Sequence, residues 1–196
     1  MKFIGGAPAA ERNKGAILEV LTDWFTLPGR VLEIGSGAGQ HALALSTALP
    51  HLAWQATEVP PRFSDLQQNL AGTGLPTPIE LDVLSGDWPT GFSYGFSANV
   101  LHIIPERAGD ALIEGMAGSL DKGGRLALYG PFRYGDAFTS DSNRAFDASL
   151  RARDPASGIR DRYRLESRAA AAGLVLSADI AMPANNQLLV LTREKT

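Results

Sequence analysis

The stretch Glu33-Ile34-Gly35-Ser36-Gly37-Ala38-Gly39 decides how this 196-residue chain folds. It overlaps the short apolar run Arg30–Ile34 (RVLEI) and precedes Gln40–Leu49, which has the composition of a helix. Because glycine lacks a Cβ atom, the backbone turns sharply here and lets a ligand approach closely, while the next helix offers its N-terminus. The order strand, glycine loop, helix predicts a ligand-binding turn, although a tight strand-to-helix connection alone would also use glycine.

The spacing of the glycines differs from that of a nicotinamide-dinucleotide fingerprint. That fingerprint places glycine at the first, third and sixth positions, and here the sixth position counted from Gly35 is Gln40. Glu33 is also foreign to it. An acid before Gly-x-Gly-x-Gly resembles the first motif of class I methyltransferases. The resemblance implies that the loop wraps the methionyl part of S-adenosylmethionine and that Glu33 helps to hold its ammonium group, often through water.

Alternating helix-like and strand-like segments surround this motif. Helices are expected at about Asn13–Phe25, Arg62–Ala71 and Glu106–Leu120. Strands are expected at Leu52–Thr57, at Ile79–Leu81, within Tyr94–Ile104 and at Arg125–Tyr129. Asp121–Gly124 reads as a turn and Gly130–Asp161 as the least regular stretch. The alternation predicts a mostly parallel sheet covered on both faces.

The end of the chain breaks this alternation. The strand-like runs Leu174–Met182 and Gln187–Thr192 are joined by only Pro183–Asn186, and so short a connection predicts an antiparallel hairpin. The expected fold is therefore α/β, a Rossmann-like class I methyltransferase fold. It has a mostly parallel seven-stranded sheet with a C-terminal antiparallel hairpin, in a single domain over residues 1–196.

Two further acids stand at predicted strand ends. Glu58 closes the second strand, 19 residues after Gly39, and Asp82 closes the third. The resemblance implies that Glu58 binds the ribose hydroxyls of the cofactor and that Asp82 binds its adenine amino group. A carboxylate such as that of Glu58 can accept strong hydrogen bonds from both ribose hydroxyls. One such acid alone is more often a solvated loop residue. Three acids after successive strands, all at one edge of a parallel sheet, favour a ligand site.

Several blocks along the chain resemble one narrower family, the methyltransferase-like protein 26 family. They are Pro8–Lys14, Leu32–His41, Leu81–Val83, Asn99–Ile103, Tyr129–Phe132, Gly158–Asp161 and Met182–Asn186. Glu58 departs from the aspartate expected at its position. The cofactor-binding residues expected on this basis are Asn13, Glu33, Gly35, Ser36, Gly37, Gly39, Glu58, Asp82, Val83 and Asn99.

The acceptor side offers weaker candidates. His102 follows the fourth strand at the active edge and is the candidate general base, with a structural histidine as the equal alternative. His41 is expected to pack or cap near the loop. Candidate acceptor-binding residues are Arg12, Tyr129, Arg133, Asn185 and Asn186. Ordinary turn chemistry explains the asparagines as well, and Asn13 also fits the N-cap of the first helix.

Arginines are in excess in one segment. Seven arginines and four acids lie between Arg144 and Arg168, in a chain whose net charge is −3. The guanidinium fork matches a carboxylate or phosphate. A small anionic acceptor held by Arg133, Arg144, Arg151 or Arg160 is one hypothesis, and ion pairs with nearby acids on a solvated helix face are the other.

Composition excludes several classes of function. The absence of cysteine excludes disulfide scaffolds, thiolate catalysis and cysteine-ligated metal, and no cluster has metal-ligand spacing. The small charge disfavours nucleic acid. No apolar run is long enough to span a membrane, which leads us to expect a cytoplasmic protein of unspecified oligomeric state. The expected function is an S-adenosylmethionine-dependent methyltransferase with a small-molecule acceptor. The alternatives are a non-catalytic cofactor-binding protein and, more distantly, a nicotinamide oxidoreductase.

Overall fold

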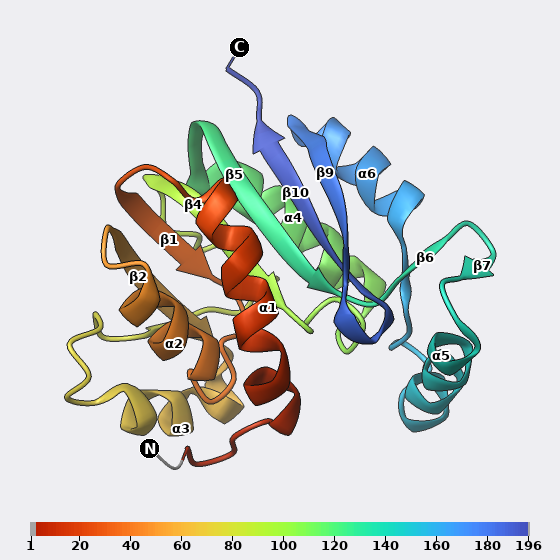
Figure 1. The fold of residues 1–196 in the computed structure, drawn as a ribbon, viewed down its shortest axis with the longest axis horizontal. Coiled ribbons are helices and arrows are strands. Elements are labelled where there is room, and N and C mark those ends of the chain that lie inside the picture. The colour runs from red at the N-terminus through yellow and green to blue at the C-terminus, as the bar shows by residue number, and fades with distance from the viewer. Residues whose placement is uncertain (1–2, 196) are drawn as a thin grey trace.

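A computed structural model describes residues 3–195. Its main sheet has seven strands in the order β3-β2-β1-β4-β5-β10-β9 (Figure 1). The strands are β1 (Gly29–Glu33), β2 (Leu52–Glu58), β3 (Ile79–Glu80), β4 (Phe92–Ala98), β5 (Leu120–Gly130), β9 (Leu174–Met182) and β10 (Asn186–Arg193). Only β10 runs against its neighbours. The predicted class I methyltransferase fold with its antiparallel C-terminal strands is confirmed.

Helices cover both faces of the sheet. One face packs on α1 (Pro8–Trp24), α2 (Gln40–Ala48) and α3 (Pro60–Leu70), and the other on α4 (Glu106–Ser119) and α6 (Arg162–Ala171). Successive strand residues divide between the two cores: Val31 lies on the first side and Leu32 on the second. Because successive residues of a strand face opposite sides of the sheet and both sides are covered, nearly every residue of such a strand is apolar.

Two predicted boundaries are wrong. The first helix begins at Pro8, not near Asn13, because proline at the first helical position has the required φ and needs no hydrogen bond for its missing N–H. Asn13 therefore lies inside α1 and is not its N-cap. Asp121–Gly124 lies within β5 rather than in a separate turn, although the register with β4 shifts there.

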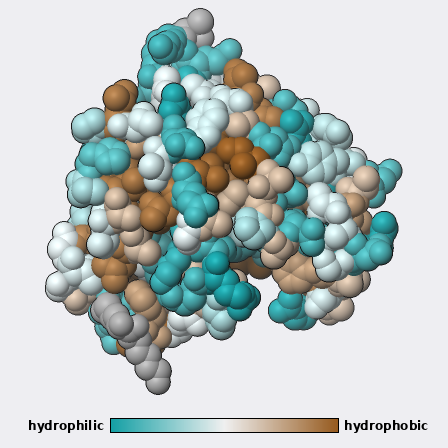
Figure 2. Space-filling model, viewed as in Figure 1, coloured by the Kyte–Doolittle hydropathy of each residue, from teal (hydrophilic) through white to brown (hydrophobic). Residues whose placement is uncertain are grey.

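The stretch predicted to be least regular has a structure of its own. It forms β6 (Phe132–Tyr134), β7 (Ala137–Phe138), β8 (Arg160–Asp161) and α5 (Asp141–Arg153). The three short strands make a second sheet in the order β7-β6-β8. In space-filling form the molecule is notched at its lower margin, beside the projecting α5 (Figure 2). No helix within residues 3–195 is long and apolar enough to cross a membrane.

Candidate functional site

A cavity of about 400 Å³ lies at the edge of the sheet where the parallel strands end. Its walls include Ile34–Ala38, which follow β1, and Ala98–Val100, at the end of β4. These two strands are neighbours, and the order of the strands reverses between them. Open α/β sheets bind their ligands at such a switch point, outside the carboxyl ends of the strands.

The three glycines of the loop all have positive φ, but for different reasons. A Cβ at Gly35 would lie 2.5 Å from Val100 Cγ2, and one at Gly39 would lie 2.8 Å from Leu70 Cδ2. These two glycines allow the turn after β4 and helix α3 to pack closely against the loop. A Cβ at Gly37 would meet nothing within 4 Å, and this glycine lines the cavity. Gly37 therefore leaves backbone exposed to a ligand.

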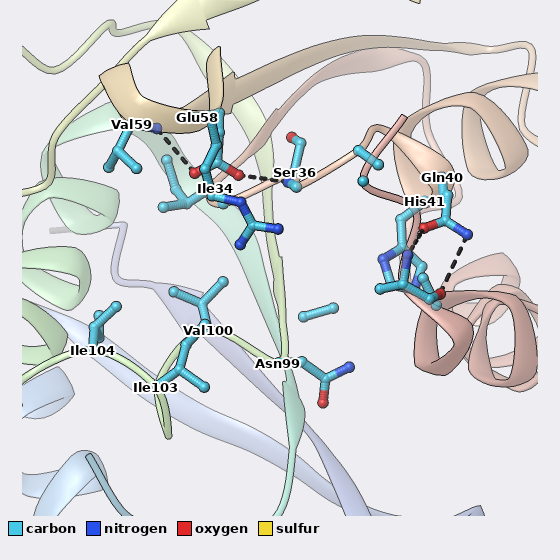
Figure 3. A pocket seen from close by; sticks show the side chains of 18 of the residues that line it. Ile34, Ser36, Gln40, His41, Glu58, Val59, Asn99, Val100, Ile103 and Ile104 are labelled. Carbon is cyan, nitrogen blue, oxygen red and sulfur yellow. Dashed lines mark hydrogen bonds between the residues drawn. The ribbon is translucent and has the colours of Figure 1, made fainter. Parts of the chain in front are cut away.

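Glu58 reaches across the glycine loop from the end of β2. Its Oε2 accepts a hydrogen bond from the Gly37 amide at 2.6 Å, and its Oε1 accepts one from the Val59 amide at 3.0 Å (Figure 3). The residue is only 6% exposed and lines the cavity. A buried carboxylate thus stands on the cavity wall beside the loop.

Glu33 lies behind the loop rather than on the cavity wall. It is buried, and its Oε2 accepts a hydrogen bond from Trp54 Nε1 at 2.8 Å. Burial raises the pKa of this carboxyl to about 7, against the opposing effect of hydrogen bonds from Trp54 and Ser36. Glu33 is not among the residues that line the cavity, and its expected role toward the ammonium group, often through water, stays a prediction.

The other predicted cofactor residues divide in the same way. Those that line the cavity are Gly35, Ser36, Gly37, Glu58, Val83 and Asn99, whereas Asn13, Glu33, Gly39 and Asp82 are not among its lining residues. Asp82 is exposed, and its Oδ1 accepts a hydrogen bond from the Leu84 amide at 2.9 Å. Asn99 has a φ of 60°, an outlier for a residue with a side chain, which asparagine tolerates best.

Polar side chains from four elements lie close together beside the cavity. His41 Nε2 donates to Asn13 Oδ1 at 2.7 Å, which joins α2 to α1. Burial raises the pKa of the Tyr129 hydroxyl, at the end of β5, and the neighbouring side chains of Asn13 and Asn186 oppose this shift. The tyrosine is only 5% exposed. Asn13, Tyr129 and Asn186 are thus brought together, although Tyr129 is not among the residues that line this cavity.

The two histidines near this edge differ in position. His41 lines the cavity, and burial lowers its pKa to about 4, so its ring is neutral near pH 7. Because the Asn13 oxygen only accepts, Nε2 carries the proton and Nδ1 keeps a lone pair. His102 is buried behind the wall with its ring edge on Phe146, and burial together with the Arg160 charge lowers its pKa to about 4.

The remaining acceptor candidates are not among the residues that line the cavity. Arg12 is exposed on α1. Asn185 has a φ of 58°, and its carbonyl accepts a hydrogen bond from Asn143 Nδ2 at 2.8 Å. This agrees with the alternative prediction, in which Asn185 serves the turn between the last two strands. Arg133 donates to the Gly135 carbonyl and pairs with Asp136 at 4.0 Å.

The hypothesis of an anionic acceptor held by arginines gains no support from the described residues. None of the four arginines named for it lines the cavity. Arg151 pairs with Asp147, Arg144 is exposed and stacks over Phe138, and Arg160 is occupied by backbone carbonyls. Arg151 forms an ion pair and Arg160 binds backbone carbonyls, which is closer to the alternative hypothesis of arginines paired within the protein.

Arg160 and its neighbours brace the turn that forms one wall of the cavity. Arg160 donates to the carbonyls of Leu101 and Ile104. The Gly158 amide and the Ser157 hydroxyl donate to the carbonyls of the two residues between, at 3.0 and 3.1 Å. Four consecutive carbonyls are thus satisfied by one short segment, residues 157–160.

Replacing Arg160 by alanine should lower the free energy of unfolding by about 1–2 kcal/mol, because the two carbonyls lose a charged donor. Lysine cannot reproduce the planar fork and should recover only part of this loss. Urea titration of both variants measures the effect. Arg153→Ala, at an exposed site on α5, is the control. Equal stability of wild type and Arg160→Ala would show that the bracing contributes nothing.

Several cavity residues were not expected from the sequence. The group consists of Gly5, Ala7, Ala9, Ala10, Gln40, His41, Val59, Arg62, Ile103 and Ile104. Gln40 and His41 directly follow the glycine loop, a position that could have indicated them. The small residues before and at the start of α1 carry no recognisable pattern apart from the Pro8–Lys14 block.

Comparison with known proteins gives the same fold. The apo S-adenosylmethionine-dependent methyltransferase SibL superposes with a TM-score of 0.79 at 22% identity, and covers 94% of this chain and 55% of its own. Human N-acetylserotonin methyltransferase, solved with its cofactor, gives 0.76 at 15% identity over 94% and 56% of the two chains. The chain thus spans about half the length of these structures.

A curated protein is also similar in sequence. The L-tyrosine C(3)-methyltransferase of Streptomyces lavendulae is 27% identical over 103 residues, which are 51% of this chain and 28% of that protein. A family model described as protein of unknown function DUF938 matches residues 5–193. Since this match extends over nearly the whole sequence, the chain belongs to the DUF938 family.

Proposed function

We propose that this protein is an S-adenosylmethionine-dependent methyltransferase acting on a small-molecule acceptor. The observation that carries the proposal is the position of a buried carboxylate, Glu58, on a cavity at the switch point beside a glycine loop. The blocks quoted above support kinship with the methyltransferase-like protein 26 family as a further part of the proposal.

The residues present fit this cofactor. Gly37 leaves its backbone open to the cavity, and Glu58 offers two oxygens to vicinal hydroxyls such as those of a ribose. The part of the wall built from Leu81, Val83 and Ile104 is apolar and suits a flat base. When bound, the cofactor would supply a methyl group on a positively charged sulfur.

The protein's contribution to methyl transfer is positioning. An in-line displacement needs the acceptor atom aligned with the methyl group and shielded from water, which the walls of the cavity would help to provide. His41 offers a neutral ring on the cavity wall. In the proposal, His102 remains a candidate base, and Tyr129 with Asn186 remains a candidate contact for a polar acceptor.

Transfer of label tests the proposal. The protein should move a labelled methyl group from S-adenosylmethionine to a component of the small-molecule fraction of a cell extract and release S-adenosylhomocysteine. Binding of both compounds without label transfer in any fraction would favour the non-catalytic binding protein. Binding of NAD, with neither methionine derivative bound, would favour the oxidoreductase.

A further inference from the structure

A wall of the cavity is formed by the residues Ile4–Ala10, here named the covering segment. It runs from beside α3 into the start of α1 (Figure 1). The residues it contributes to the cavity are Gly5, Ala7, Ala9 and Ala10. None has a side chain larger than a methyl group, so the segment encloses the cavity without filling it.

Gln40 holds the middle of the covering segment. Its Oε1 accepts a hydrogen bond from the Ala7 amide at 2.6 Å, and its Nε2 donates to the Ala7 carbonyl at 3.3 Å and to Glu11 Oε1 at 2.6 Å. The Gln40 side chain, 6% exposed, thereby hydrogen-bonds to both the backbone amide and the backbone carbonyl of Ala7 (Figure 3). Gln40 is also the residue that follows the glycine loop.

Asn69 holds the start of the segment in the same manner. Its Oδ1 accepts from the Ile4 amide at 2.9 Å, and its Nδ2 donates to the Ile4 carbonyl at 2.9 Å. The same Nδ2 donates to the Ala38 carbonyl at 3.0 Å. Asn69, 4% exposed, therefore connects the covering segment to the glycine loop.

We propose that Gln40 and Asn69 are positioning residues that hold the covering segment closed over the bound cofactor, so that release of this segment limits cofactor exchange. The inference rests on the proposed function. Two buried amides from different helices make the same bidentate contact to residues three apart, which fixes the path of the segment at two points. A ligand that contacts the closed segment favours closure in return.

The rate of S-adenosylhomocysteine dissociation tests this inference. Gln40→Ala and Asn69→Ala should each raise it roughly tenfold or more, the effect of losing one or two hydrogen bonds. In the wild type, the ligand should slow hydrogen exchange at the Ile4 and Ala7 amides, and the variants should lose this protection. Gln68→Ala, on the exposed face of α3, should behave as the wild type.

The hydrogen-exchange measurement on the wild type does not depend on any variant. It therefore tests the inference even if Gln40→Ala or Asn69→Ala fails to fold. Unchanged protection of both amides on ligand binding would overturn the inference, as would dissociation at the wild-type rate in both folded variants. In either case the proposed function would stand, because the ligand still binds. A wild type that does not bind S-adenosylhomocysteine would overturn the proposed function and this inference with it.

Discussion

Replacing Glu58 by alanine should weaken the binding of S-adenosylhomocysteine by about 10- to 150-fold, equivalent to roughly 1.5–3 kcal/mol for hydrogen bonds to a charged group. The carboxylate lines the cavity and also accepts the Gly37 amide, so its loss removes a ligand contact and loosens the glycine loop. Isothermal titration calorimetry at constant pH measures the change.

Glu80 provides a matched control for this substitution. It lies directly opposite Glu58 in the β2–β3 pairing but is exposed. Glu80→Ala should leave the affinity unchanged. If a folded Glu58→Ala variant binds as tightly as the wild type, Glu58 is only a structural acceptor for the loop and the ribose role is wrong.

Replacing Glu33 by glutamine should stabilise the protein at pH 8 by up to about 3 kcal/mol. The folded-state pKa of Glu33 is raised to about 7 by burial, whereas the unfolded value is near 4.5. Between these values the folded state binds more protons than the unfolded state, so the Glu33 contribution to stability falls as pH rises. Glutamine keeps the size and an acceptor for Trp54 Nε1 but has no charge to bury.

The difference between variant and wild type isolates this effect. His41 and His102 have lowered pKa values near 4 and make stability rise with pH up to about 6.5, but they contribute equally to both proteins. Denaturant titrations from pH 4.5 to 8 should therefore show a stability difference that grows with pH. A constant difference, or one that matches the exposed control Glu19→Gln, would contradict a raised Glu33 pKa.

The sequence was most informative where apolar runs alternate with glycine turns. Strands such as Arg30–Ile34 and the C-terminal hairpin were predicted within a few residues, because burial on both faces demands continuous apolar residues. The strands after Gly130 were missed, since β6, β7 and β8 are each only two or three residues long, too short to show a periodic pattern of apolar residues.

The candidate site was predicted in part, for a physical reason. Spacing along the chain places an acid at each strand end, but it does not say which way the side chain points. Glu58 faces the cavity, whereas Glu33 turns back to Trp54 and Asp82 bonds to its own turn. The contact between Asn13 and His41 joins residues 28 positions apart and depends on how α1 packs on α2.

The arginines show the same limit. Their excess between Arg144 and Arg168 is visible in the sequence, but their partners are not. Arg160 serves the carbonyls of Leu101 and Ile104, and Arg164 pairs with acids on α4. Local charge counts predict how many basic groups are present; only the tertiary contacts show which of them already have acidic or carbonyl partners.

Calorimetric titration of the wild-type protein with S-adenosylhomocysteine, and with NAD in parallel, tests the central claim most directly. The account predicts saturable binding of S-adenosylhomocysteine with one site per chain, competition by S-adenosylmethionine, and no heat of binding with NAD. At 100 times its dissociation constant the ligand should also stabilise the fold by about 2.7 kcal/mol. Saturable binding of NAD, with no response to either methionine derivative, would contradict the account.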